Sequence, residues 1–307
     1  MKPLSREASL VMVLGVLLAV LGFAAPAFFS PQPLLSRLSM EAPCLVATCG
    51  MVAVMLVRQI DISVGSQFAL CSVLAGTLAS KNLPTSLLVP TVLLAGTVLG
   101  GFNGWLVAIL RLPSIVVTLA TMVILRETVR WHQQGALLNL PADLQWFGLS
   151  QSAGQWTLIA AALLLTGILA WALQNLRAGR CLYAVGSDPE AARLAGISPS
   201  TTKALTFLLC GLLTAAAALM NLVQSPQVDP KSGTGLELKT VAAAVVGGIA
   251  ISGGRGRLWG AALGLLLLAT ISPALTYLHV EAYWEKAVQG AVILLAVILD
   301  RKSSATP

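Results

Sequence analysis

The sequence predicts an all-α, polytopic membrane protein with about ten membrane-spanning helices, and two observations lead to this fold class. Hydrophobic residues make up 57% of the 307 residues and charged residues only 10%, whereas a typical soluble domain is about 45–50% apolar and about 25% charged. The apolar residues also gather in repeated runs of roughly 20, the length that crosses about 30 Å of hydrocarbon. No shift in composition divides the chain, so residues 1–307 are expected to form one domain.

The first apolar run must be distinguished from a signal peptide. It follows Lys2 and Arg6, and Ala25-Pro26-Ala27 near its end resembles a cleavage site. The run is nevertheless long enough to cross a bilayer, so it is expected to remain as the first helix.

The remaining runs follow at short intervals along the chain. Three of them are short or weakly apolar (42–57, 62–80 and 238–252), so a count of nine spans stays open beside ten. The run 84–110 is long and rich in glycine, so it can tilt or break. The ten expected spans are 9–29, 42–57, 62–80, 84–110, 112–130, 155–174, 204–224, 238–252, 257–279 and 282–299.

The basic residues predict the orientation. The net charge is +7, but the basic residues lie mostly at the ends of apolar runs and form no aromatic-interleaved surface, which argues against nucleic-acid binding. The densest basic group lies in 175–203, which is therefore expected to be cytoplasmic. With ten spans, both termini are then cytoplasmic, and the loop 131–154, which has no Lys or Arg, is periplasmic. Arg37 and Lys81 are exceptions to this pattern.

Signatures of covalent chemistry are missing from the sequence. It contains no GxxxxGK[ST], HExxH or GxSxG motif. Its two histidines and five cysteines show no metal-ligand spacing, so the cysteines are expected to be buried free thiols. We therefore expect no catalytic residue, no metal and no cofactor.

The second part of the basic loop, residues 184–203, contains the signature of a short helix. Ser187 or Asp188 can cap a helix that begins near Pro189, and Gly196 can end it about two turns later.

Four blocks of the sequence, taken in order, resemble those of a known family. They belong to permease subunits of bacterial ABC importers of the ribose, galactoside and rhamnose class, which are related by fold to branched-chain amino-acid permeases. The blocks are RQIDISVGS (58–66), GGFNGWLVAILRLPSIVVTLAT (100–121) followed by Arg126, AVGSDPEAARLAGI (184–197) and GTGLELKTVAAAVVGGIAISGGRGRLWG (233–260).

The sequence departs from the family pattern at a few positions. Arg58-Gln59 replaces Gly-Gly, Asp188 replaces Asn, Ala120 replaces Gly, and Glu127 stands where Gly is usual. The Arg-x-Ile-Asp arrangement and the tail AYWEKAVQGAVILLAVILD are more similar to the rhamnose and autoinducer-2 branch than to the ribose branch.

The resemblance implies a multi-pass subunit of the bacterial inner membrane that imports a small polar solute, a monosaccharide of the rhamnose kind or autoinducer 2. It implies three partners: an ABC ATPase, a second permease copy or paralogue, and a periplasmic solute-binding protein. The short cytoplasmic helix would dock into the ATPase, and its small residues Ala191, Ala192 and Gly196 would face that partner or turn tightly against it. The positions carried over to this role are Asp188, Pro189, Glu190, Ala191, Ala192, Arg193, Gly196 and Ile197.

Several polar residues inside or beside the spans are candidates for the translocation pathway. Arg58 and Asp61 are expected to form an ion pair, because ionisable groups in a membrane are costly unless paired; the pair either gates the pathway or fixes the topology. Arg126 and Glu127 present the same two alternatives. The polar residues Asn103, Thr118 and Thr121 offer hydrogen bonds either to a hydroxylated solute or between helices.

Two other classes of protein compete with an import permease as explanations of this sequence. A stand-alone secondary transporter or channel would need more buried acids than Asp61 and Glu127 provide. A polytopic membrane enzyme would need catalytic groups that the sequence does not show.

Overall fold

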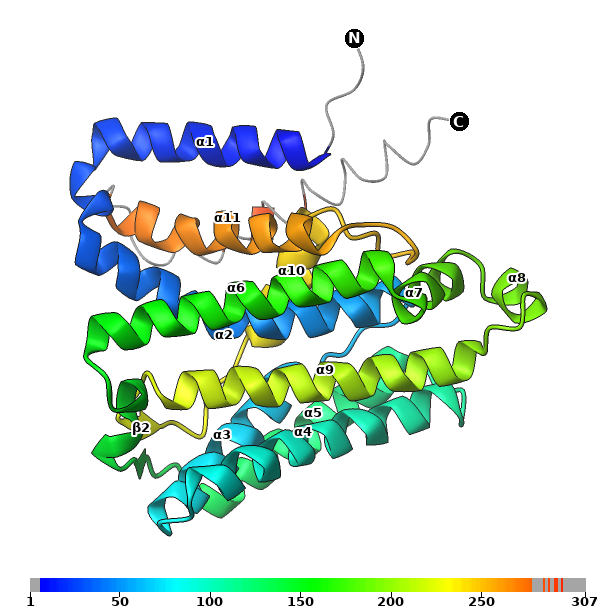
Figure 1. Ribbon diagram of the computed structural model, residues 1–307, viewed down its shortest axis with the longest axis horizontal. Coiled ribbons are helices and arrows are strands. Elements are labelled where there is room, and N and C mark those ends of the chain that lie inside the picture. Colours follow the sequence, from blue (N-terminus) through cyan, green and yellow to red (C-terminus); the bar gives the residue numbers. More distant parts are fainter. Residues whose placement is uncertain (1–5, 278–283, 285–286, 288–289, 292–293, 295–307) are drawn as a thin grey trace.

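The computed structural model describes residues 6–277 together with 284, 287, 290, 291 and 294, and within these residues it is almost entirely helical (Figure 1). The long helices are α1 (Arg6–Ala24), α2 (Pro31–Leu56), α4 (Thr85–Ala108), α5 (Ser114–Gln133), α6 (Gln151–Asn175), α9 (Pro199–Leu222) and α11 (Leu258–Tyr277). The shorter helices are α3 (Val64–Ser80), α7 (Arg177–Ser187), α8 (Pro189–Leu194) and α10 (Leu236–Val246). Two 3-10 turns, η1 (Pro26–Phe29) and η2 (Ala142–Gly148), and two short antiparallel strands, β1 (Leu138–Asn139) and β2 (Gln227–Val228), lie between helices.

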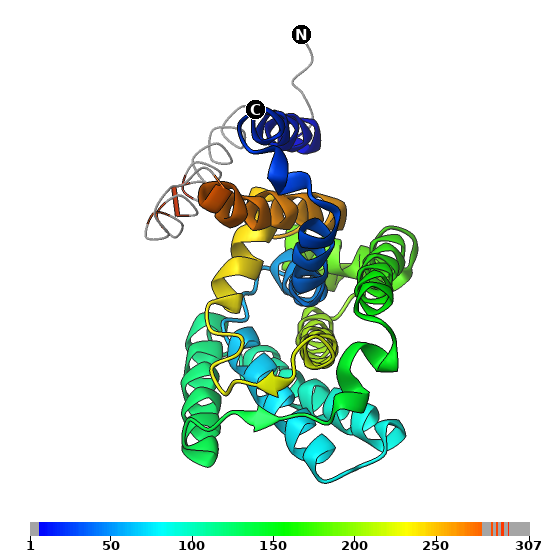
Figure 2. The ribbon, with the colours of Figure 1, turned by 90° about the vertical axis from the view of Figure 1, so that its left-hand side faces the viewer.

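The long helices lie side by side in layers (Figure 2). Helix α9 lies at the centre between α2 and α4, helices α1 and α11 pack together at one edge, and α3, α4 and α5 form the opposite edge. The strands and η2 lie at one end of the bundle, and α7 and α8 lie at the other end (Figure 1).

Six helices among the described residues are long and apolar enough to cross a membrane, which confirms a multi-pass helical protein without fixing the count at ten. Helix α5 is 20 residues long but has three charged residues in its second half. Helix α3 has 17 residues and α10 only 11, so α10 rises about 16 Å and is too short to cross hydrocarbon. The span expected at 282–299 lies outside the described residues, apart from isolated positions.

The boundaries differ from the expected spans at three places. Helix α2 begins at Pro31, not near residue 42, and so it includes Arg37. The helix expected over 238–252 ends at Val246, because Gly248 turns the chain with a φ of 89°. Of the two alternatives for 84–110, a tilt or a break, the break is absent, because α4 is continuous over 24 residues.

The glycines of α4 serve close packing. A side-chain carbon at Gly100 would collide with the carbonyl oxygen of Phe207, and one at Gly211 would collide with the carbonyl oxygen of Gly96. These glycines let α4 and α9 approach until their backbones touch, which is how small residues support helix association in membranes.

Arg37, an exception to the charge pattern, is held within the fold. Its Nη2 donates to the Tyr277 hydroxyl at 2.7 Å, and its guanidinium lies 4.8 Å from the Phe28 ring centroid and 4.7 Å from that of Tyr277. Two aromatic faces stabilise the cation, so Arg37 has a structural use at this end of the bundle.

Candidate functional site

A buried polar network surrounds Asp61. This residue lies in the connector between α2 and α3 and is fully buried. Its Oδ1 accepts hydrogen bonds from the Ser63 backbone N–H at 2.9 Å and the Ser63 hydroxyl at 2.5 Å, and its Oδ2 accepts one from Gln67 Nε2 at 3.3 Å. Neutral donors therefore satisfy this carboxylate.

The network continues into α4 and α5. The Ser63 hydroxyl oxygen accepts from Asn103 Nδ2 at 2.8 Å and from Gln67 Nε2 at 2.7 Å. The Asn103 Oδ1 accepts from the Thr121 hydroxyl at 2.8 Å. The structure thus brings together three of the candidate pathway residues, Asp61, Asn103 and Thr121. Their hydrogen bonds link α3, α4 and α5.

Thr118 anchors the connector itself. Its hydroxyl oxygen accepts from the Ile62 backbone N–H at 3.1 Å and donates to the Ser114 carbonyl at 2.9 Å. The connector backbone is therefore held against α5, and the interhelical alternative for these threonines is the one observed in this conformation.

Arg126 has a partner that the sequence reasoning missed. Its Nη2 lies 3.2 Å from Oε1 of Glu237, a buried residue in the first turn of α10. Glu127 instead pairs with Arg130 at 2.9 Å on an exposed face. The expected pair of Arg126 with Glu127 is not formed. The sequence signal for the right partner was Glu237 itself, the one acidic residue in the block 233–260.

The N-termini of α3 and α10 meet beside this pair. A side-chain carbon at Gly65 would collide with Glu237 Oε2 and with the Gly233 carbonyl oxygen. Gly233 and Gly235 have φ angles of 82° and 85°, which glycine adopts without strain. The Glu237 carboxylate therefore lies close to the N-termini of α3 and α10 and to the Arg126 guanidinium.

Arg58 lies away from Asp61, and the expected ion pair between them is wrong. Arg58 Nε donates to the Gly186 carbonyl oxygen at 2.5 Å, and its Nη2 donates to the Ser187 carbonyl oxygen. These are the last two carbonyl groups of α7, which lack helical partners and carry the negative end of the helix dipole. With a φ of 62° at Arg58, the chain turns and the side chain points to α7.

The Arg58 contact belongs to a junction of three segments: 56–58 after α2, 186–187 at the end of α7, and 253–254 after α10. The Gly254 N–H donates to the Leu56 carbonyl at 2.9 Å. A side-chain carbon at Gly186 would collide with the Leu56 carbonyl oxygen, and one at Gly254 would collide with Ser187. Gly253 and Gly254 turn the chain sharply here, with φ angles of 79° and 70°.

Tyr183 adds a contact next to this junction. Its hydroxyl donates to the Gly256 carbonyl oxygen at 2.9 Å. Burial raises the pKa of Tyr183 and outweighs the opposing effect of Arg257, so the phenol stays a neutral donor to this carbonyl.

Helix α8 begins and ends as the sequence indicated. Of the two possible caps, Asp188 is the one used: its Oδ1 accepts from the backbone N–H groups of Glu190 at 2.9 Å and Ala191 at 3.0 Å. Gly196 closes the helix with a φ of 80°, and Arg193 pairs with Glu190 at 3.1 Å on the exposed face. The preceding helix α7 was missed, since a basic loop was expected there.

The buried face of α8 corrects one expectation. Ala192 is only 4% exposed and packs with Val57 and Val185 beside the junction, with Ile197 nearby, so it faces the protein's own core. Leu194, which is absent from the expected docking positions, is 83% exposed at the free end of α8. The exposed residues of α8 and of the turn after it are Glu190, Ala191, Arg193, Leu194, Ala195 and Gly196.

No group of three or more His, Cys, Asp or Glu residues that could hold a metal occurs in the part of the chain that the structure describes. All five cysteines are free, four of them buried and Cys181 half-buried.

Comparisons with known proteins add sequence relationships. A family model described as "Branched-chain amino acid transport system / permease component" matches residues 34–297. The ribose import permease protein RbsC of Escherichia coli is 33% identical over 308 residues, which cover 97% of this chain and 94% of that protein. The autoinducer 2 import system permease protein LsrC of an Enterobacter species is 36% identical over 299 residues, which cover 96% and 87%. No solved structure matches the chain significantly.

Proposed function

The chain belongs to the family of branched-chain amino acid transport system permease components, and we propose that it is the membrane-spanning subunit of an ABC importer for a small polyhydroxylated solute of the ribose or autoinducer 2 kind. The similarity to an import permease over 97% of the chain is the observation that carries this proposal. Rhamnose, which the sequence favoured, has no support from these relatives, so the solute is assigned only to the class of small sugars and furanose-like molecules. The chain is a transport component and performs no hydrolysis of its own.

Helix α8 supports the coupling part of the proposal. It projects past the ends of the long helices (Figure 1) and is held by the junction, which lies directly beside the connector that carries Asp61. In this account a separate ATPase subunit grips α8, and its closure moves α7, the junction and the connector together. Arg58 transmits the motion, and Asp61, Asn103, Thr118 and Thr121 keep the connector attached to the helices that line the pathway.

The charge distribution supports an orientation. Arg177, Arg180 and Arg193 lie at the α7–α8 end of the bundle, and Arg58 and Arg255 lie at the junction on the same end. Because basic residues are retained on the cytoplasmic side, we place this end inside the cell and the β1–β2 end in the periplasm of an inner membrane. A periplasmic binding protein would then deliver solute at the β1–β2 end, and a second permease copy or paralogue would complete the pathway.

Purification of the tagged chain from native membranes in a mild detergent tests the proposal. We expect an ATPase and a second permease subunit to co-elute and to be identified by mass spectrometry. Recovery of the chain without any ATPase, combined with solute uptake that persists after ATP depletion, would instead place it among secondary transporters.

A further inference from the structure

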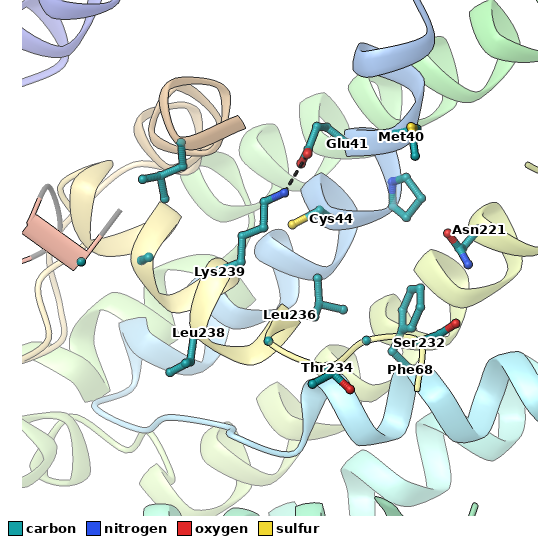
Figure 3. A pocket seen from close by; sticks show the side chains of 16 residues that line it. Met40, Glu41, Cys44, Phe68, Asn221, Ser232, Thr234, Leu236, Leu238 and Lys239 are labelled. Carbon is teal, nitrogen blue, oxygen red and sulfur yellow. Dashed lines mark hydrogen bonds and ion pairs between the residues drawn. The ribbon is translucent and has the colours of Figure 1, made fainter. Parts of the chain in front are cut away.

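The bundle contains a cavity of about 700 Å³ that is separate from the Asp61 network. Residues of α2, α3, α9, α10 and α11, together with the chain just before α10, line it (Figure 3). Its volume falls in the range of small-molecule sites, about 300–1,000 Å³.

The backbone along this cavity is irregular. The chain from Ser232 to Gly235 leads into α10 through turns and lines the cavity next to Phe68 of α3. Non-helical backbone at membrane depth is tolerated where it is buried in protein or lines a water-filled cavity. Discontinuous helices that meet inside a bundle are also where transporters bind their substrates, and here α3 and α10 meet at Gly65 and Gly233.

The polar groups of the cavity suit a neutral solute with many hydroxyl groups. Glu41 of α2 and Lys239 of α10 face each other at 2.7 Å across the cavity wall (Figure 3). The second carboxylate oxygen of Glu41 is buried and has no hydrogen-bond partner among the described residues. A hydroxyl group both donates and accepts, so it can satisfy this acceptor and bond to the ammonium group at once.

We propose that this cavity is a transient binding site for the transported sugar, with the ring against Phe68 and hydroxyl groups bound by Glu41, Lys239 and Thr234. This inference rests on the proposed import function and deepens it by naming the residues that meet the solute inside the membrane. Phe68 supplies the apolar face, and the charged pair supplies directional hydrogen bonds. The site must bind the solute weakly enough to release it. Loss of one contact should therefore change the affinity for the solute more than the stability of the fold.

Uptake by the purified complex in proteoliposomes tests this site. The probe is tritiated ribose, autoinducer 2 or rhamnose, whichever the wild-type complex takes up fastest. For Phe68→Leu and Glu41→Gln we expect the KM for the loaded binding protein to rise or the maximal uptake rate to fall by about five- to twentyfold, with ATP hydrolysis and abundance kept. Phe102→Leu, at a 53% exposed residue of α4 outside the cavity, is the matched control and should transport as the wild type does.

A labelling measurement covers the case in which a cavity variant misfolds. In a variant without the five native cysteines, Thr234→Cys should react with a hydrophilic thiol reagent, and the transported sugar should slow this reaction during ATP turnover. Ser152→Cys, exposed on α6, should react at the same rate with and without sugar. If the wild-type complex transports sugar, the Phe68→Leu and Glu41→Gln variants transport equally well, and sugar does not protect Thr234→Cys from labelling, the proposed site is wrong while the proposed function stands. A wild-type complex that imports none of the three probes would overturn the proposed function and this inference together.

Discussion

At the scale of single residues, the charges of this protein find partners that the sequence does not place beside them. Arg58 and Asp61 are three positions apart, yet one binds the carbonyl groups of α7 and the other binds neutral donors of its own connector. Arg126 likewise reaches Glu237, a residue 111 positions away. Sequence spacing identifies which ionisable groups need a partner, but the backbone turn at Arg58 and the meeting of α3 with α10 decide which partner each one receives.

Arg58 is expected to couple α7 to the connector. Arg58→Ala removes two charge-assisted hydrogen bonds to the end of α7, so solute uptake should fall at least fivefold while the complex still hydrolyses ATP. Arg58→Lys can bond one carbonyl and should recover part of the uptake. Arg111→Ala, at another exposed arginine with a positive φ, is the control; equal losses at both positions would show that only the lost charge matters.

Arg126 and Glu237 are expected to act as a unit. Arg126→Ala leaves a buried carboxylate without its cation, and breaking such a pair costs about 3–5 kcal/mol when burial is complete. The Arg126 side chain is 28% exposed, so a loss toward the lower end of that range is expected. The measurement is thermal unfolding of the detergent-purified chain.

The matched control for this pair is the exposed pair of Arg130 with Glu127, where Arg130→Ala should change stability by less than about 1 kcal/mol. Arg126→Met combined with Glu237→Gln should recover most of the stability lost in Arg126→Ala. If the stability loss of the double variant equals the sum of the losses in Arg126→Met and Glu237→Gln alone, the two residues act independently.

At the scale of elements, α8 was predictable and its orientation was not. Asp188, Pro189 and Gly196 are local signals for a cap, a first turn and a stop, and the helix begins and ends where they indicate. Which face is buried depends on α7 and on Val57, far along the chain. The small size of Ala192 therefore reflects packing inside this protein.

Leu194 and Ala192 are expected to behave differently when each is changed to Glu. Leu194→Glu puts a charge on the exposed end of α8, so the chain should insert and accumulate normally but lose the ATPase, at a cost of about 2 kcal/mol or more in binding. Ala192→Glu forces a charge between Val57 and Val185 and should lower the abundance of the chain itself. Abundance in membranes and ATPase co-purification measure the two effects; normal ATPase binding by Leu194→Glu would remove α8 from the docking surface.

The apolar runs predicted most long helices but misplaced the interrupted ones. Runs such as 155–174 and 204–224 correspond to α6 and α9, because a continuous apolar stretch in lipid has to be helical. The run at 238–252 covers most of the 11-residue helix α10 and the glycine turn that follows it. Both parts are apolar, so hydropathy cannot separate them. Three of the candidate pathway residues, Asp61, Asn103 and Thr121, meet in one network, and their role in transport stays a prediction. Glu237 and the cavity at Phe68 depend on the meeting of α3 and α10, which the sequence does not indicate.

At the scale of the whole molecule, the two ends of the bundle differ in kind. One end has the strands and η2, and the other has α7, α8 and the junction (Figure 1). Arg177, Arg180 and Arg193 lie at the second end, and Arg37, one of the two exceptions, is held at the first end between two aromatic rings. This asymmetry is what the proposed orientation explains.

Reporter fusions test this orientation. A fusion at Gly196, after α8, should report a cytoplasmic location, and one at Leu138, in β1, should report a periplasmic one. The physical reason is the retention of Arg177, Arg180 and Arg193 on the inside. A fusion at Gly196 that reads periplasmic would reverse the molecule and exclude docking of α8 to a cytoplasmic ATPase.

The most direct test of the whole account is solute uptake by proteoliposomes that contain this chain, its co-purified permease partner and its ATPase, with the binding protein outside and ATP inside. We predict uptake of a small sugar or of autoinducer 2 that requires both ATP and the binding protein, and that Leu194→Glu abolishes. Equal uptake with and without ATP, or by the chain alone, would contradict the assignment as an ABC import permease.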